Sequence, residues 1–181
     1  MGARALTFAA RLPGRLEVAL GLETVHPEAL ARLRKGMTLA DYDRATAALA
    51  AAGIAHRAFV LVGTPFVPKA ESVEWTLRSI DRALARGARV VSLLPLRRGG
   101  DGLEPFFASG ETAPPTLAEV EACLEPRAGV HGAVVQVDPW DLALLGSCAA
   151  CAPARRARLA RISARGAGEA PIDCAHCRGR S

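Results

Sequence analysis

The sequence predicts an α/β protein in which parallel strands alternate with helices, followed by a small cysteine-rich tail. Short apolar runs recur along the first 137 residues, and segments with the spacing of amphipathic helices separate them. Such alternation is typical of a parallel sheet with crossover helices. The pattern stops after Asp141, and four of the five cysteines follow it. We therefore expect a body over residues 1–146 and a metal-binding tail over residues 147–181.

The first predicted elements are a strand, two helices and a second strand. Residues 16–20 form a short, largely apolar run that ends at a glycine, as a half-buried strand does. Pro27 suits the first turn of a helix. Thr38, with an aspartate three residues later, predicts a capped helix that runs to Gly53. Residues 57–62 are almost continuously apolar, which indicates a strand covered on both faces.

The remaining predicted elements continue the alternation of helix and strand. Apolar residues over 73–84 repeat at helical spacing, and residues 90–96 form another apolar strand. The glycine- and proline-rich residues 97–115 are typical of a long loop. Thr116, with a glutamate three residues later, predicts a capping box at the start of one more helix. Residues 133–137 complete the series as a last strand.

The composition predicts a cytoplasmic protein whose positive charge is concentrated in the tail. Half of the residues are apolar, but no apolar run approaches the roughly 20 residues that a membrane helix requires. From Cys148 onward there are seven arginines and two acidic residues, so the tail carries +5, which equals the net charge of the chain. The basic character therefore belongs to the tail.

The cysteines of the tail predict a metal site. Cys148 and Cys151 form one C-x-x-C pair, and Cys174 and Cys177 form a second pair after 22 intervening residues. Two such pairs bring four thiolates to one tetrahedral ion, and the spacing is slightly longer than that of zinc ribbons. We expect Zn²⁺, with an iron–sulfur cluster as the alternative. Cys123 stands alone and is expected to be a core residue.

A short basic helix is predicted between the two cysteine pairs, over residues 153–162. Its arginines form a surface that could contact the phosphates of RNA. The alternative is a solvated helix, because the tail has no aromatic residue on which a base would stack.

Several segments in the same order carry a resemblance to a known family. They are residues 21–28, 34–41, 51–54, 61–65, 71–72 and 148–156. Together they resemble the radical SAM superfamily, in the branch of the Elongator catalytic subunit and the archaeosine-synthase-associated proteins. The resemblance covers residues 16–140 and implies half of a βα barrel.

The resemblance also implies residues that bind S-adenosylmethionine. Glu23 matches an acid that contacts the ribose or the methionyl part, and Arg34 matches a basic residue that holds the methionyl carboxylate. Gly63, Thr64 and Pro65 match a turn against the adenine. The alternatives are a helix-capping acid for Glu23 and an ordinary strand-to-loop turn for residues 63–65.

The sequence lacks the cluster-binding motif of the family, and this limits what the resemblance implies. The chain has no C-x₃-C-x₂-C motif to bind the [4Fe–4S] cluster of these enzymes. We therefore expect the C-terminal part of a radical SAM protein, separated from its cluster-binding half by truncation, a frameshift, a misplaced start codon or gene splitting. A separately encoded half would be its partner.

Two functions remain open at this stage. In the first, the intact form cleaves S-adenosylmethionine reductively and modifies a substrate, for which the branch resemblance and the basic tail suggest tRNA. In the second, the chain is a zinc-stabilised RNA- or protein-binding module without catalysis.

Overall fold

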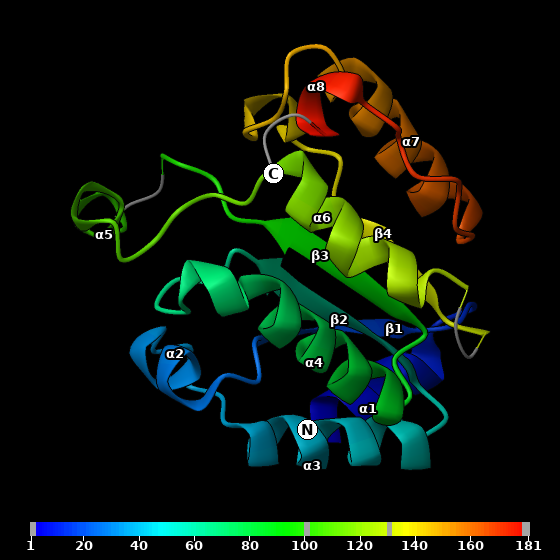
Figure 1. Ribbon diagram of the computed structural model, residues 1–181. Helices are drawn as coiled ribbons and strands as arrows, with labels where there is room; N and C mark the ends of the chain where they lie inside the picture. Colours follow the sequence, from blue (N-terminus) through cyan, green and yellow to red (C-terminus); the bar gives the residue numbers. More distant parts are fainter. Residues whose placement is uncertain (1–2, 100–101, 130–131, 179–181) are drawn as a thin grey trace.

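A four-stranded, all-parallel sheet forms the centre of the computed structural model, which describes residues 3–99, 102–129 and 132–178 (Figure 1). The strands are β1 (Glu17–Glu23), β2 (Ala55–Val62), β3 (Val90–Pro95) and β4 (Val134–Val137). They lie in the order β1-β2-β3-β4, so each strand pairs with the next one along the chain. This sequential order is that of a segment of a βα barrel. The predicted α/β fold with parallel strands and a cysteine-rich tail is confirmed.

Helices connect the strands, and α3, α4 and α6 lie on one face of the sheet (Figure 1). The helices are α1 (Ala3–Arg11), α2 (Pro27–Arg32), α3 (Leu39–Ala51), α4 (Ser72–Ala85), α5 (Glu104–Ser109), α6 (Leu117–Leu124), α7 (Ala152–Arg165) and α8 (Ala175–Arg178). Short 3₁₀ turns cover Lys69–Glu71, Glu125–Arg127 and Leu142–Leu144. Among the described residues, no helix combines the length and apolar character needed to cross a membrane.

The predicted capping signals position two of these helices. The Thr38 hydroxyl accepts a hydrogen bond from the backbone of Asp41, and the Asp41 carboxylate accepts one from the backbone of Thr38. Thr116 and Glu119 form the same reciprocal pair at the start of α6. Each box satisfies N–H groups that the first turn of a helix leaves without partners.

Helix α5 lies inside the stretch that was predicted to be a loop. Pro105 occupies its first turn, and Gly110 ends it with a left-handed backbone at φ 79°. Phe107 is the buried residue of this helix. Composition alone predicted a loop because the helix is short and the glycines and prolines that flank it dominate the stretch.

The two faces of the sheet have different surroundings. On β2, the buried side chains of His56, Ala58, Val60 and Val62 alternate with the partly exposed residues between them. The register continues the buried face across the sheet, because Val60 pairs with Leu93 and Leu93 pairs with Val137. The hydrophobic core therefore lies between this face and the covering helices.

A row of polar side chains crosses the opposite face. Arg57 donates to Glu17 at 3.0 Å and to the Ser92 hydroxyl at 3.5 Å, and Gln136 donates to the same hydroxyl at 3.2 Å. These four residues come from the four strands, so the row ties the sheet together on its less covered side.

Helix α7 covers the outer edge of β4. The Ser163 hydroxyl accepts a hydrogen bond from the Val137 N–H at 3.0 Å and donates to the Val137 carbonyl at 3.4 Å. Leu159 and Ile162 of the same helix are fully buried in the core cluster of the body. The tail therefore shares the core of the α/β body, and Ser163 supplies hydrogen bonds that a neighbouring strand would otherwise make.

Candidate metal centre

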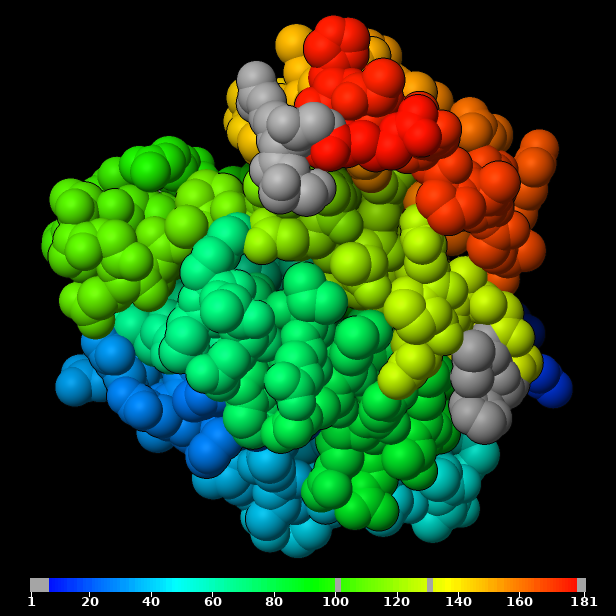
Figure 2. All heavy atoms as spheres, in the orientation of Figure 1, coloured from blue at the N-terminus to red at the C-terminus, as the bar shows by residue number. Residues whose placement is uncertain are grey.

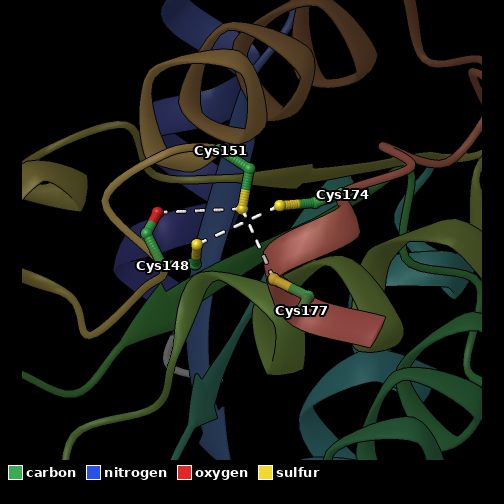
Figure 3. Close-up of side chains that lie close together, drawn as sticks. All are labelled: Cys148, Cys151, Cys174 and Cys177. Carbon is green, nitrogen blue, oxygen red and sulfur yellow. Dashed lines mark hydrogen bonds between the residues drawn. The ribbon is translucent and has the colours of Figure 1, made fainter. Parts of the chain in front are cut away.

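The four cysteines of the tail converge on one point, as predicted (Figure 3). All four sulfurs lie within 4.8 Å of one another. The Cys148 and Cys174 sulfurs are 4.0 Å apart, and the Cys151 and Cys177 sulfurs are 3.7 Å apart. Four thiolates bound at about 2.3 Å to one Zn²⁺ would stand about 3.8 Å from one another. The geometry therefore fits a single tetrahedral ion.

Each cysteine pair is shaped by a tight turn at the start of a helix. The Cys151 N–H donates to the Cys148 carbonyl at 3.1 Å, just before α7 begins. The Cys177 N–H donates in the same way to the Cys174 carbonyl at 3.0 Å, at α8. A C-x-x-C spacing closed by such a turn brings its two sulfurs to one side of the backbone. This is why the spacing was a reliable signal in the sequence.

A reversal after α7 brings the second pair back to the first. Gly166 ends α7 with a left-handed backbone at φ 65°, and its N–H donates to the Ile162 carbonyl at 2.8 Å. Residues 167–173, here named the return segment, then run back beside α7 toward α8 (Figure 1). Arg158 donates to the Ala170 carbonyl at 2.7 Å, and Arg161 pairs with Glu169 at 2.9 Å. These contacts fix the segment that carries the second cysteine pair.

Arg155 connects the cysteine cluster to the body. Its Nε donates to the Cys151 sulfur at 3.2 Å, and its Nη1 forms a close ion pair with Glu121 of α6. The hydrogen bond from Arg155 lowers the pKa of the Cys151 thiol to about 7. Hydrogen bonding to Cys151 and Cys174 raises the pKa of the Cys177 thiol to about 11. Arg155 thus places positive charge beside the sulfurs, which favours the thiolate form that metals bind.

A second arginine lies completely inside the protein. The Arg158 side chain is 0% exposed, and its guanidinium pairs with Glu121 at 3.1 Å and also contacts Glu125. Glu121 is itself buried, and it shares its two carboxylate oxygens between Arg155 and Arg158. Buried charges require partners of this kind. Figure 2 shows the orange and red tail packed directly against the yellow-green part of the body that includes α6.

Glu121 is the residue at this centre that the sequence analysis missed. The acid occupies the helical phase of Leu117 and Leu124, which are both fully buried. An acid at an apolar phase of a helix signals a buried partner of opposite charge, and the tail arginines were the available partners. The arginines of α7 were predicted to lie in solvent or on RNA. Two of them, Arg155 and Arg158, point into the protein and pair with Glu121.

The acid predicted to contact S-adenosylmethionine lies at the carboxyl end of β1. Glu23 is buried, has a left-handed backbone at φ 62°, and pairs through Oε1 with Lys35 at 2.9 Å. A Cβ on Gly21 would stand 2.6 Å from the same oxygen, so this glycine makes room for the carboxylate. Arg34 is exposed, and it is Lys35 that contacts the acid.

The predicted adenine turn follows β2, the strand next to β1. Gly63, Thr64 and Pro65 are all buried. A Cβ on Gly63 would stand 2.8 Å from Cδ of Pro115, so packing against the chain before α6 explains this glycine. Glu23 therefore faces Lys35, while Gly63 faces Pro115, and the binding roles of these residues stay predictions.

Comparison with protein-family models and with curated protein sequences finds no match to this chain. The resemblance to radical SAM proteins therefore remains a prediction. Fold and site together define an α/β protein with a four-cysteine, metal-binding cluster. Cys123, the fifth cysteine, is fully buried on α6. Burial raises the pKa of its thiol to about 12, so it is an inert core residue.

Proposed function

We propose that the cysteine cluster binds one structural Zn²⁺. We propose further that the chain is a zinc-stabilised RNA- or protein-binding module without catalysis. The observation that carries this proposal is the convergence of all four sulfurs within 4.8 Å. Catalytic zinc sites keep a position open for water or substrate, whereas structural sites have four protein ligands. Four thiolates fill the tetrahedron, which supports a structural role.

The spacing of the sulfurs favours a single ion over an iron–sulfur cluster. In a four-iron cluster each cysteine binds a different iron, so the cysteine sulfurs stand farther apart than the ligands of one ion. Two of the six sulfur separations are 3.7 and 4.0 Å, and none of the six exceeds 4.8 Å. Thiolates also suit the borderline-soft character of Zn²⁺.

The metal content of the purified protein tests this proposal. We expect one zinc per chain by elemental analysis, and strong visible absorption from tetrahedral thiolate coordination after replacement of zinc by Co²⁺. A Cys123→Ala variant should keep the full metal content, because this cysteine lies on α6 outside the cluster. Iron with inorganic sulfide, or less than half an equivalent of any metal, would contradict the assignment.

The buried acid at the end of β1 supports a second candidate function. We propose, from the resemblance to radical SAM proteins, that Glu23 contacts S-adenosylmethionine in an assembly with a separate cluster-binding half. An acid held at φ 62° and buried beside Lys35 is a strained, charged group at the carboxyl edge of a parallel sheet. Ligands of open α/β sheets bind at this edge.

Equilibrium dialysis with S-adenosylmethionine tests the second candidate on the chain alone. We expect weak binding that the Glu23→Gln substitution reduces by about tenfold, as loss of one charge-assisted hydrogen bond implies. Glu28→Gln is the matched control, since Glu28 is exposed on α2. Binding that both variants retain equally, or no binding at millimolar ligand, would count against this candidate.

A further inference from the structure

We infer that the metal controls access to the outer edge of β4. With the ion bound, α7 covers this edge; when the ion is lost, α7 and the return segment come away and the edge opens. This inference rests on the proposed metal site and adds to it a conformational consequence.

The two cysteine pairs bracket α7 and the return segment. Cys151 directly precedes the helix, and Cys174 follows the return segment. A bound ion therefore links the start of α7 to the end of the segment that reverses beside it. Such a link closes a loop between Cys148 and Cys174, which are 26 residues apart in the sequence. Closing this loop removes conformational freedom from the released state, as a disulfide of that span would.

Without the ion, α7 is held by two buried apolar side chains and one buried arginine. Its fully buried residues are Arg158, Leu159 and Ile162, and the first of these is charged. A buried ion pair adds little net stability, because desolvation of the charges offsets their attraction. The pairs with Glu121 and Glu125 therefore specify where the helix lies. Two apolar side chains and the metal supply most of the energy that keeps it there.

Within the described part of the chain, no strand pairs with the outer edge of β4, and α7 covers the hydrogen-bonding groups there. Val134 donates to the Arg89 carbonyl, and Asp138 donates to the Leu93 carbonyl, so these alternate N–H groups face β3. The N–H of Val137 points the other way and donates to Ser163. Release of α7 leaves this edge open to solvent or to another strand.

Most of the core does not depend on α7. Fully buried side chains on other elements include Leu22, Tyr42, Val60, Ile80 and Leu117. They come from β1, α3, β2, α4 and α6. Loss of the metal is therefore expected to produce a local opening of the tail and the β4 edge, while the remainder stays folded.

Amide hydrogen exchange on the full chain tests the inference. The zinc-loaded protein is compared with protein treated with a chelator, and exchange is followed by NMR or by mass spectrometry of fragments. We expect the Val137 amide to exchange at least about tenfold faster after zinc removal, with unchanged protection over Ala55–Val62 of β2. Cys123→Ala should behave as the unmodified chain does.

The Ser163→Ala variant tests the contact of α7 with β4 without changing the metal ligands. In zinc-loaded Ser163→Ala, the Val137 N–H loses its acceptor while all four cysteines remain. We expect faster exchange at Val137 with undiminished zinc content. A chain that binds no metal would overturn both the proposed function and this inference. Zinc binding with equal protection of β4 before and after chelation would overturn the inference alone, as would loss of protection throughout β2.

Discussion

Replacing Arg158 by methionine is expected to destabilise the zinc-loaded protein by about 3 kcal/mol, since removal of one partner of a buried ion pair leaves the other charge without compensation. Arg158 is 0% exposed and contacts both Glu121 and Glu125. Methionine preserves much of the apolar volume of the side chain but supplies no charge. The substitution also removes the donor to the Ala170 carbonyl in the return segment.

Urea denaturation in the presence of zinc measures this effect, and Arg161→Met is the matched control. Arg161 lies one turn further along α7, is 47% exposed and pairs with Glu169. A pair of this kind contributes between zero and about 1 kcal/mol. We therefore expect the Arg158 variant to lose at least twice as much stability as the control. An equal loss of stability in the two variants would show that the buried ion pair of Arg158 contributes no more than an exposed pair.

The strands could be predicted from the sequence because each has a local apolar pattern. The turn signal at Gly21 was wrong, since β1 continues through this glycine to Glu23. The run over residues 57–62 became β2 with two more residues at its start, and the run over residues 90–96 became β3 with one residue fewer. The expected cover on both faces of β2 was wrong, because its buried residues alternate with partly exposed ones. Continuous apolar runs are typical of strands in parallel sheets and can be read without knowledge of distant partners. The capping signals at Thr38 and Thr116 are local in the same way.

The cysteine cluster could also be predicted, because the chemistry of thiolates restricts what two C-x-x-C pairs do. The ion pairs that connect the cluster to the body could not be predicted. Glu121 and Arg158 are 37 residues apart in the sequence, and each has an ordinary alternative as a solvated residue on a helix. Their pairing depends on the position of α7 beside α6, which the local pattern does not contain.

Gly63 shows a different reason for incomplete prediction. The resemblance matched Gly63 to a turn against adenine, and an ordinary strand-to-loop turn was the alternative. The position does require glycine, since φ is 76° and a Cβ would be 2.8 Å from Cδ of Pro115. The neighbour is another segment of the chain. A sequence shows that a position needs glycine, but the folded structure decides whether a ligand or a loop lies against it.

Replacing Cys151 by serine is expected to lower the stabilisation by zinc from about 4 kcal/mol to less than about 1.4 kcal/mol, which is the largest effect in this protein. Cys151 is the buried member of the cluster and receives the hydrogen bond from Arg155. Loss of an outer partner weakens metal sites by about 10- to 100-fold, so loss of a ligand should exceed about 100-fold. Zinc at a thousandfold excess over its Kd stabilises a folded chain by about 4 kcal/mol. Thermal unfolding with zinc and with chelator measures this difference. Cys123→Ala should retain the full zinc-dependent rise in Tm, and Cys151→Ser should show less than half of it. A full rise in the Cys151 variant would mean that three thiolates suffice and that the site has an open position, which would turn the structural assignment toward a catalytic one.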